Sequence, residues 1–529
     1  MQHNSKPAYR LRRLVQFRLR TLLVLLLAAS LLMGWWRHTV QRYGRQQEAL
    51  AEVAHLAKFV AFEPGQPAWL RPFADEAVFR DVVHLSFQSR RDFKDEHIVH
   101  LAKMPRLRRL SLQHARISDE GLKHLAKLEH LDTLSLESTR VGNEGMPYLS
   151  DLPRLRMLQL NGTNVTGAGL EHLVELPSLE RLEIVNQRIG NDDLQPLTRM
   201  PRLRQLEVGN SKFTLAGWKT LSDLPLEELE IYGPESLEIR LEHMEHLRSL
   251  DIAAWRIHDV ILVDLPNLSQ LKFRQHIGGN VWLMGLPRLR DLNLDGKELS
   301  DRTFQSVTSL PNLEKLSLAH ARPRSGSWRN LRRLKSIKEL DLTATGIDDH
   351  ELRHLSELKT LEVLRLNVNP IHAKALRQLS QLSNLRVLDI SHTPLFESEL
   401  ASRSTRGNLR RSALFRSVFL PDDSFRSLLE LKQLRRLNVD NTGIAFEELM
   451  LLSELPNLEH VGIFSHELSR EELAAVCNEL KSAEVSATPA TRFNAQQIQV
   501  FESESEQLLR LSRQLRSYRE ANSREPDSE

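Results

Sequence analysis

A leucine-rich period of 24 residues runs through most of the chain and constrains its fold more than any other feature. Repeats open at Leu107, Leu131 and Leu155 and share the pattern L-x-x-L-x-L-x-x-T-x-I-x-D-x-G-L-x-x-L-x-x-L-x-x. The first half alternates at a period of two, which predicts a short strand, and the second half spaces leucines by three, which predicts a helix. A single repeat cannot bury its apolar stripe, whereas stacked repeats can. Further repeats open at Leu179, Leu203, Leu289, Leu313, Ile337, Leu361, Leu385, Leu409, Leu434 and Leu458, shorter ones of 21 residues at Leu226, Leu247 and Leu268, and a degenerate first one near Val82.

This pattern predicts an α/β solenoid of about 17 repeats over residues 82–481. The expected shape is a horseshoe with a parallel sheet on the concave face and helices on the convex face. Proline at the end of a repeat, as at Pro153, ends the helix before the next strand. An aspartate or asparagine before the Gly-Leu pair is expected to cap the helix of its own repeat, as at Asp119, Asn143 and Asp349.

The repeats resemble the leucine-rich-repeat family over about three quarters of the chain. The segment from Thr345 to Leu352, TGIDDHEL, is similar to the helix-bearing bacterial class, and the segment from Phe17 to Leu23, FRLRTLL, is similar to the anchor of bacterial single-pass proteins with such repeats. The single cysteine, Cys477, excludes disulfide-bonded end caps, which favours a bacterial or an intracellular setting. The asparagine ladder that is common in the family is mostly replaced by threonine, at Thr139, Thr163, Thr345, Thr393 and Thr442, with asparagine at Asn369.

The N-terminal segment from Thr21 to Trp36 has 16 residues and no charge. As a helix it spans about 24 Å, short of the roughly 30 Å hydrocarbon core of a bilayer. Extension to residues 14–40 closes the gap if Arg18, Arg20 and Arg37 reach the headgroups, and Trp35 and Trp36 then lie at the interface. Six Lys/Arg precede the segment, so the positive-inside rule predicts a cytoplasmic N-terminus and extracytoplasmic repeats in the cell membrane. The alternative is a signal peptide cleaved near Ala28-Ala29-Ser30.

The formal net charge of +3 comes from the N-terminus. Residues 1–45 hold nine Lys/Arg and no Asp or Glu, and the remainder holds 63 basic and 69 acidic residues. A nucleic-acid partner needs a basic face on the folded part, so none is expected.

The expected organisation has five parts. A basic cytoplasmic N-terminus covers residues 1–20, and a transmembrane signal anchor covers 21–40. Residues 41–81 form a juxtamembrane helix and cap, with Leu50, Val53, Leu56, Ala57 and Val60 on one face of a helix over 41–62. The repeats follow over 82–481, and residues 482–529 form a polar tail. That tail carries one amphipathic stretch through Phe501, Leu508, Leu511, Leu515 and Tyr518, which is either a frayed surface helix or a coiled-coil segment.

The concave face is the expected ligand surface. One side chain per strand faces it, and four successive positions are acidic, at Glu183, Glu207, Glu230 and Asp251. Like charges on neighbouring strands repel, so a cationic group on a partner would relieve them. The alternative is a solvated acidic face screened by salt. The hypothetical partner-binding set is these four acids together with Glu228, Tyr232 and Trp255, which are expected to lie close to them. The full column is Ser111, Ser135, Gln159, Glu183, Glu207, Glu230, Asp251, Lys272, Asn293, Ser317, Asp341, Arg365, Asp389, Ala413, Asn438 and Gly462.

Two irregularities interrupt the pattern. The 21-residue repeats lack the Gly-Leu helix, which predicts a thinner convex side and either a specialised binding segment or sequence drift. In 401–416, Arg403 and Arg406 replace core leucines, so this segment is expected to form a loop. A second basic stretch contains Arg322, Arg324, Arg329, Arg332, Arg333 and Lys335; binding of an anionic polymer competes there with plain solvation.

Catalytic and metal-binding signatures are not found in the sequence. His97/His100 and His243/His246 are bare H-x-x-H pairs without a third ligand, and Cys477 lies in an apolar stretch typical of a core. We therefore expect no enzyme activity, no cofactor and no metal. The predicted function is a non-catalytic, membrane-anchored scaffold that binds a protein or a surface polymer through the concave face. The alternative is a substrate-recognition subunit of an enzyme complex, such as a ubiquitin-ligase-like assembly.

Overall fold

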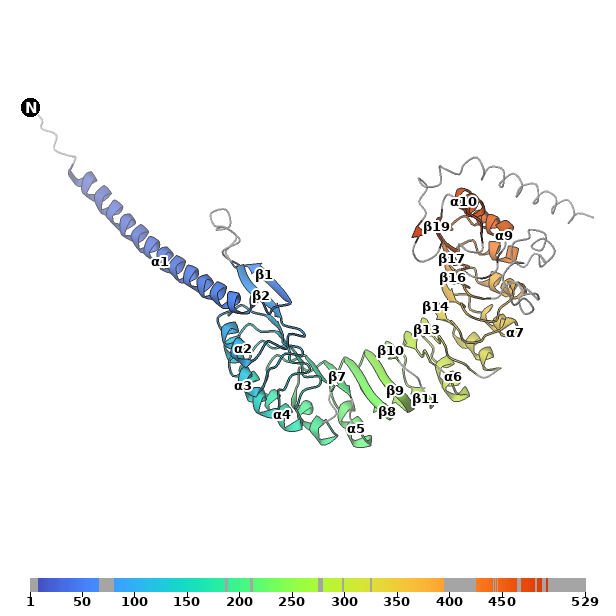
Figure 1. Ribbon diagram of the computed structural model, residues 1–529, viewed down its shortest axis with the longest axis horizontal. Coiled ribbons are helices and arrows are strands. Elements are labelled where there is room, and N and C mark those ends of the chain that lie inside the picture. The colour runs from blue at the N-terminus through green and yellow to red at the C-terminus, as the bar shows by residue number, and fades with distance from the viewer. Residues whose placement is uncertain are drawn as a thin grey trace, which may run out of the picture. The chain divides into compact units, whose positions relative to one another are not determined.

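The computed structural model divides the chain into two compact units, Met1–Lys212 (unit 1) and Phe213–Glu529 (unit 2). Each unit is a stack of repeats with a parallel sheet on one face and helices on the other, as the sequence predicted (Figure 1). The described residues are 8–65, 80–185, 189–209, 213–274, 279–296, 299–323, 326–393, 425–440, 442, 444, 446–463, 468–480, 483–487 and 491–492, with the backbone alone at 8–20, 234–237, 254–257, 470, 487 and 491–492.

Unit 1 contains one strand per repeat in continuous parallel register. Leu85, Leu110, Leu134, Leu158 and Leu182 are register partners from strand to strand, and each is fully buried or nearly so. The apolar spine therefore has the 24-residue spacing of the sequence. The elements are β1 (Phe59–Pro64), β2 (Arg80–Ser86), β3 (Arg109–Ser111), β4 (Thr133–Ser135), β5 (Met157–Gln159), β6 (Arg181–Val185) and β7 (Gln205–Gly209), with α2 (Asp95–Leu101), α3 (Asp119–Leu122), η2 (Leu125–Lys127), η3 (Asn143–Leu149), α4 (Gly167–Leu173) and η4 (Asp192–Arg199).

One long helix, α1 (Ala8–Ala54), joins the apolar N-terminal segment to the first repeat. Its apolar part is exposed, including Trp35 and Trp36, whereas its last turns pack on the first strand and bury Tyr43 and Val53. The Gln46 amide donates to Arg80 O at 2.6 Å and accepts from Val82 N at 3.3 Å. It therefore satisfies two backbone groups at the start of β2, before the part of this strand that pairs with β3. These two hydrogen bonds attach the C-terminal part of α1 to the first parallel strand, β2.

The expected helix over 41–62 is wrong at its C-terminal end. Residues Phe59–Pro64 form strand β1, which pairs antiparallel with β2. The physical reason is edge protection, because the first parallel strand has backbone groups that only another strand can pair along its length. Of the predicted apolar face, Leu50 and Val53 are buried on the helix, whereas Val60 lies in the strand.

The carboxylates and amides before the Gly-Leu pairs join repeats together. Asp119 accepts from Gly142 N at 2.7 Å, Asn143 from Thr166 N at 2.9 Å, and Asp349 from His372 N at 2.8 Å, in each case in the following repeat. The prediction that they cap their own helices is therefore wrong. Each backbone N–H at the start of the next outer element needs an acceptor, and the side chain one repeat earlier lies within reach.

The threonines that replace the asparagine ladder bond within their own turn. Thr139 donates to Leu136 O at 2.6 Å and Thr163 to Leu160 O at 2.6 Å. Asn369 has a longer reach, because its Nδ2 donates to Leu366 O in its own turn and to Leu342 O in the preceding repeat. Threonine thus satisfies one carbonyl locally, whereas asparagine also bonds to the adjacent repeat.

Within unit 2, the strands are also in parallel register from repeat to repeat, with one discontinuity. Strand β16 pairs directly with β17, with Asp389 opposite Asn438, so the expected strand at Ala413 does not lie between them. The predicted loop at 401–416 and the tail helix through Phe501 lie outside the described residues. The elements that pair or stack here are α5 (Leu215–Ser222), β8 (Glu228–Glu242), β9 (Ser249–Val263), β10 (Gln270–Phe273), β11 (Val281–Met284), β12 (Asp291–Asn293), α6 (Asp301–Thr308), β13 (Lys315–Ser317), η5 (Ser327–Arg333), β14 (Glu339–Asp341), α7 (Asp349–Leu352), η6 (Arg353–Leu355), β15 (Val363–Arg365), η7 (Ala373–Gln381), β16 (Val387–Asp389), η8 (Phe425–Glu430), β17 (Arg436–Asn438), α9 (Phe446–Leu451), η9 (Leu452–Glu454), β18 (His460–Ile463), α10 (Arg470–Glu479), β19 (Glu484–Ala487) and β20 (Thr491–Arg492).

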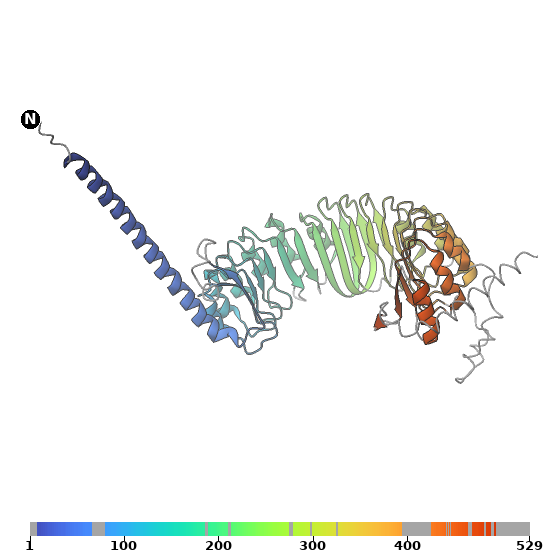
Figure 2. The same cartoon turned by 90° about the horizontal axis from the view of Figure 1, so that it is seen from above.

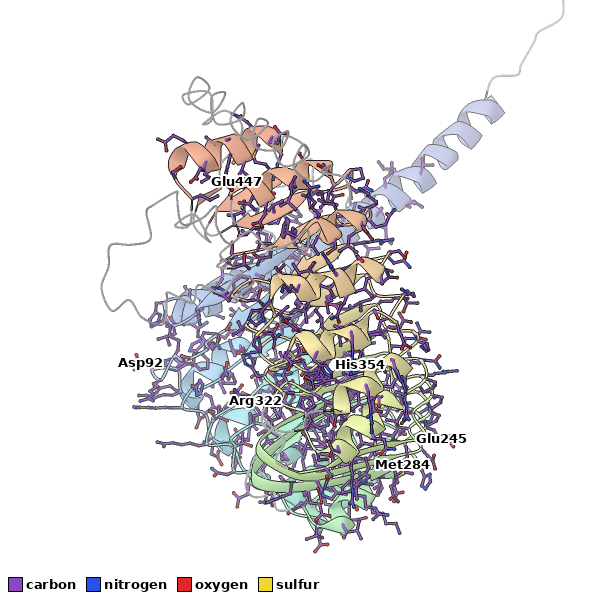
Figure 3. All side chains as sticks on the ribbon, turned by 90° about the vertical axis from the view of Figure 1, so that its right-hand side faces the viewer. Asp92, Glu245, Met284, Arg322, His354 and Glu447 are labelled. Carbon is purple, nitrogen blue, oxygen red and sulfur yellow. The ribbon has the colours of Figure 1, made fainter. Side chains whose placement is uncertain are left out.

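The 21-residue repeats carry strand where the other repeats carry helix. Strands β8 and β9 have 15 residues each and bend from one face of the stack to the other (Figure 2). The first half of β9 pairs with β10, and its second half pairs with β11. A second, small parallel sheet therefore forms the outer face here, and Figure 3 shows the helices of the later repeats stacked beyond it, with His354 among them and Met284 on β11.

Hydroxyl groups on the flanking helices satisfy both edges of this second sheet. Ser222, at the end of α5, accepts from Glu242 N at 3.2 Å on one edge. On the other edge, Thr303 and Ser306 of α6 accept from Val281 N at 2.9 Å and from Leu283 N at 2.8 Å. The helices can therefore adjoin a sheet edge without leaving buried N–H groups unsatisfied.

Replacing Thr303 by valine is expected to destabilise this junction by about 1–3 kcal/mol, because the buried N–H of Val281 loses its acceptor. Valine keeps the shape of threonine, so packing changes little. Hydrogen exchange of β11 in the full chain measures the effect, and faster exchange at Val281 is expected. Ser309→Ala, which removes an exposed hydroxyl of the same helix, is the matched control. Equal exchange rates in both variants would contradict the edge-capping role.

Candidate functional site

In unit 1, the predicted acids lie side by side on the sheet face and share one arginine. Glu183 and Glu207 are register partners on β6 and β7. The Arg181 guanidinium donates to Glu183 at 2.9 Å and lies 4.0 Å from Glu207. Gln159 also donates to Glu183 at 2.7 Å, and Glu183 is only 4% exposed. Glu183 is therefore a buried, bonded group of the sheet.

In unit 2, the next two acids of the column share another arginine. Glu230 on β8 lies opposite Asp251 on β9. Arg274 approaches Asp251 at 2.7 Å and Glu230 at 3.5 Å. The hydrogen bond that Arg274 donates to Asp251 raises the pKa of Arg274. Tyr232 donates to Glu230 at 3.3 Å, so this group of four side chains is bonded internally.

The remaining predicted residues differ in how far they are available. Glu228 is exposed at the start of β8. Trp255 lies on β9, and its side chain is outside the described residues. The inference that four acids repel until a partner arrives does not hold in its original form, because Arg181 and Arg274 supply the positive charge from within the chain. The sequence shows both arginines, two or more positions from the acids. It does not show that their side chains extend to the acids of the same and neighbouring strands.

A row of charged residues directly before the strands of unit 2 was missed by the sequence reasoning. Each repeat contributes its second residue, and the sign mostly alternates from repeat to repeat. Arg386 pairs with Glu362 at 3.0 Å, and Arg435 pairs with Glu459 at 3.1 Å. We name this the pre-strand row. Its members are Glu227, Arg248, Ser269, Arg290, Glu314, Lys338, Glu362, Arg386, Arg435 and Glu459.

Beside the pre-strand row, a second set of ion pairs joins adjacent strands. Glu339 on β14 approaches Lys315 at 3.2 Å and Arg365 at 2.8 Å, which lie on the strands to either side. Burial opposes ionisation of Glu339, yet the hydrogen bonds from Arg365 and Lys315 lower its pKa. A carboxylate between two cations on flanking strands is thus a recurrent arrangement of this sheet face.

The histidines and the cysteine have structural roles. His97 Nδ1 accepts from Lys94 N at 3.0 Å, and His243 lies 3.5 Å from Asp264. Burial raises the pKa of Cys477 to about 11, which makes it a weak nucleophile at neutral pH. Among the residues that the structure describes, no three His, Cys, Asp or Glu side chains are grouped so as to hold a metal ion.

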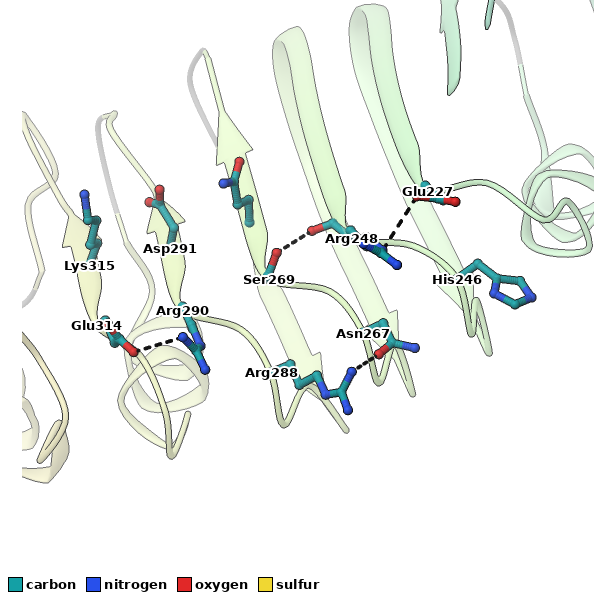
Figure 4. Close-up of a pocket in the computed structure, with 11 residues that line it drawn as sticks. Glu227, His246, Arg248, Asn267, Ser269, Arg288, Arg290, Asp291, Glu314 and Lys315 are labelled. Atoms are coloured by element: carbon teal, nitrogen blue, oxygen red, sulfur yellow. Dashed lines mark hydrogen bonds and ion pairs between the residues drawn. The ribbon is translucent and has the colours of Figure 1, made fainter. Parts of the chain in front are cut away.

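The sheet face also has a shallow hollow in unit 2. It has a volume of about 790 Å³ and is lined by polar and charged side chains of the pre-strand row and the strand starts, including Arg248, Ser269 and Arg290 (Figure 4). Gln270 and Asp291 line the hollow and are register partners on β10 and β12, and Gln270 is also the partner of Ser249 on β9. Asp251 follows Ser249 by two residues on β9, so the hollow lies beside the Glu230–Asp251–Arg274 group.

Comparison with known proteins identifies the repeats. A family model described as a leucine-rich repeat region matches residues 55–327. No curated protein matches the sequence. Among solved structures, a leucine-rich-repeat protein of Leptospira interrogans is 20% identical, with a TM-score of 0.45, over 73% of this chain and 97% of that one. Toll-like receptor 13 in complex with a single-stranded RNA is 15% identical, with a TM-score of 0.34, over 73% and 78%; an internalin of Listeria monocytogenes is 16% identical, with a TM-score of 0.28, over 80% and 93%.

Proposed function

The chain belongs to the leucine-rich-repeat family, and we propose that it is a non-catalytic interaction scaffold held in a bacterial cell membrane by its N-terminal helix. The observation that carries this proposal is the sheet face itself. The position after each spine leucine carries a polar or charged side chain from Ser111 to Glu207 in unit 1 and from Glu230 to Asp389 in unit 2, while the leucine spine is buried behind them. Such a wall offers recognition groups over many repeats and no assembled catalytic set in the described residues.

The contact surface that we propose combines the predicted acids with their arginines. Within unit 2, Glu228, Glu230, Tyr232 and Asp251 present carboxylates and a phenol beside Arg274, and Trp255 follows on the same strand as Asp251. On unit 1, we propose Glu183 and Glu207 as a separate contact patch. Mixed charge with aromatic groups favours a protein or a surface polymer over nucleic acid, which would need a basic face.

The membrane part of the proposal rests on α1. The helix has one segment, within Thr21–Ala54, long and apolar enough to cross a bilayer, and that window is 6% buried in the structure. A leucine-rich helix left exposed in water costs free energy that insertion into a bilayer would recover. Trp35, Trp36 and Arg37 would lie at one interface, with Arg18 and Arg20 at the other. The six basic residues that precede the segment place the N-terminus in the cytoplasm and the repeats outside.

Photo-crosslinking in living cells tests the scaffold function. A photo-reactive amino acid placed at Glu228, on the sheet face, is expected to form adducts with a partner. The same amino acid at Lys374, exposed on η7 of the helix face, is the matched control and is expected to form far fewer. Adducts at both positions alike would contradict recognition through the sheet face, and no adducts at either would contradict a scaffold under the conditions used.

A further inference from the structure

The pre-strand row of unit 2 has one neutral member in its first part, Ser269. Arg248 precedes it and Arg290 follows it, so two cations flank a serine where the alternation calls for an acid. The backbone confirms that these three residues occupy consecutive levels, since Ser269 N donates to Arg248 O at 2.9 Å and Arg290 N donates to Ser269 O at 3.0 Å. Consecutive levels lie about 4.8 Å apart, so the two arginines are about 10 Å apart along the row.

Two levels further on, the same row shows what normally occupies such a position. Glu314 lies between Arg290 and Lys338, at 3.5 Å from the first and 2.8 Å from the second. The hydrogen bond from Lys338, with Arg290 and Lys315 nearby, lowers the pKa of Glu314. A single carboxylate therefore bridges two cations that are two strand spacings apart, which is the spacing of Arg248 and Arg290.

At Ser269 the bridging carboxylate is missing, and both arginines pair outward instead. Arg248 lies 3.7 Å from Glu227, and Arg290 lies 3.5 Å from Glu314, each on the side away from Ser269 (Figure 4). The Ser269 hydroxyl donates to Arg248 O at 3.0 Å, so this short side chain stays close to the backbone. The hollow of about 790 Å³ lies here.

A third guanidinium borders the hollow. Arg288 donates to the side-chain oxygen of Asn267, a neutral acceptor. Arg248, Arg288 and Arg290 all line the hollow. The side chains of Arg248 and Arg290 are 70% and 67% exposed. Guanidinium groups in this state hold carboxylates and phosphates by charge-assisted hydrogen bonds.

We propose that this hollow binds a carboxylate of an acidic side chain on a partner polypeptide, and that this carboxylate lies between Arg248 and Arg290 as Glu314, two levels further on, lies between Arg290 and Lys338. The inference rests on the scaffold function proposed above and names the chemistry of the partner. The ligand completes the row by bridging Arg248 and Arg290, and Arg288 donates a further hydrogen bond. Gln270 also lines the hollow, and its side-chain amide can form a hydrogen bond with a peptide group of the partner.

The acids at the rim favour an isolated carboxylate over a dense polyanion. Glu227, Asp291 and Glu314 line the same hollow, so a polymer with closely spaced negative charges would meet them as well as the arginines. The lining holds no Phe, Tyr or Trp on which a nucleobase would stack. A polypeptide can present one carboxylate among neutral groups.

The test completes the row within the chain. Ser269→Glu supplies the missing carboxylate from the protein itself, and Ser269→Gln supplies a neutral side chain of the same size. Full-length protein in detergent micelles is titrated at low ionic strength with a fluorophore-labelled peptide that carries one glutamate among glycine and serine residues. We expect Ser269→Glu to weaken peptide binding about tenfold or more, because its carboxylate occupies the arginines in place of the ligand. Arg290→Gln is expected to weaken binding to a similar degree, because it removes one guanidinium. Ser269→Gln is expected to change binding less than about twofold.

Thermal denaturation provides a second readout that does not need the ligand. Ser269→Glu is expected to melt at a higher temperature than Ser269→Gln, because it adds the ion pairs that the row lacks. Equal binding by the Glu and Gln variants would overturn the inference. Competition by inorganic phosphate that is stronger than competition by acetate would overturn the carboxylate assignment, and tighter binding of oligogalacturonate, unaffected by Ser269→Glu, would replace the polypeptide by a polymer.

The proposed function and this inference fail separately. The photo-crosslinking experiment uses Glu228 and Lys374, neither of which lines the hollow. Adducts at Glu228 together with unchanged peptide binding in Ser269→Glu would leave the scaffold function standing and remove the hollow as its carboxylate site.

Discussion

Replacing Asn369 by leucine is expected to lower the free energy of unfolding of the repeats by about 2–4 kcal/mol. The Asn369 side chain is 2% exposed, and its Nδ2 donates to Leu342 O at 2.7 Å and to Leu366 O at 2.9 Å. Its Oδ1 accepts from Gly346 N at 2.8 Å. Leucine has the same branching and number of side-chain heavy atoms but no polar atoms, so Gly346 N and Leu366 O lose this buried partner, at about 1–3 kcal/mol each.

A graded series separates this bonding from packing. Asn369→Thr keeps the bond within its own turn, as Thr345 does to Leu342 O at 2.9 Å, and loses only the bond to the preceding repeat. Its expected cost is about half that of leucine. Hydrogen exchange and chemical denaturation of the full chain measure the series. If threonine and leucine destabilise equally, the bridging bonds contribute little and the effect is one of packing alone.

The stacking of this fold could be predicted from the sequence because it depends on spacing alone. Once each repeat has the same length, Leu110, Leu134 and Leu158 must fall at equivalent levels, and the side chains one position later must share a face. The column from Ser111 to Glu207, and again from Glu230 to Asp389, therefore lies in the predicted register. A one-residue shift would have exposed the leucines, so few alternatives were open.

Features that depend on the reach of individual side chains could not be predicted in this way. Arg181 and Arg274 each pair with two of the acids because a long guanidinium can extend to the neighbouring level, which spacing does not encode. The bond from Asp349 to the following repeat, in place of a cap on its own helix, has the same origin. The strand at Phe59–Pro64 arises from the need to pair the edge of β2, which is a requirement of the folded sheet.

The pre-strand row leaves a signal in the sequence that the leucine pattern alone does not reveal. Its signal is an alternation of sign at the second position of successive repeats, as at Glu314, Lys338 and Glu362. The 21-residue repeats were predicted to lack helices, and they do carry strand there, but the second sheet of β8, β9 and β11 was not foreseen. Its apolar alternation in Ile239 and Leu241 is visible once the strand is known.

Replacing both Leu25 and Leu26 by arginine is expected to move the protein from the membrane fraction to the soluble fraction. Both leucines lie in the apolar part of α1 and are 66% and 58% exposed. Each arginine at the centre of a membrane helix costs about 3 kcal/mol, and two are more than a 16-residue apolar segment can offset. The measurement is the distribution of the full chain after alkaline extraction of membranes.

Two controls separate hydrophobicity from added charge. Leu25→Ile/Leu26→Ile keeps the apolar character and is expected to stay in the membrane. Glu48→Arg/Glu52→Arg adds two arginines to exposed positions near the end of the same helix and is expected to have no effect. Release of the wild-type protein by alkaline extraction would contradict a membrane anchor. A mature chain that begins after Ser30 would show a cleaved signal peptide.

The orientation of the anchored chain follows from cysteine labelling, for which this protein is well suited. Cys477 is mostly buried and has a pKa of about 11, so it reacts slowly with maleimide. Cysteine introduced at exposed Lys103 should therefore be labelled by a membrane-impermeant maleimide in cells with a permeabilised outer barrier, and cysteine at Ser5 should not. The reverse pattern would place the repeats in the cytoplasm. Since α1 continues without a break from the apolar segment to Gln46, which donates to Arg80 O of β2, the repeats would then follow the anchor on the cytoplasmic side, and the partner would have to be sought there.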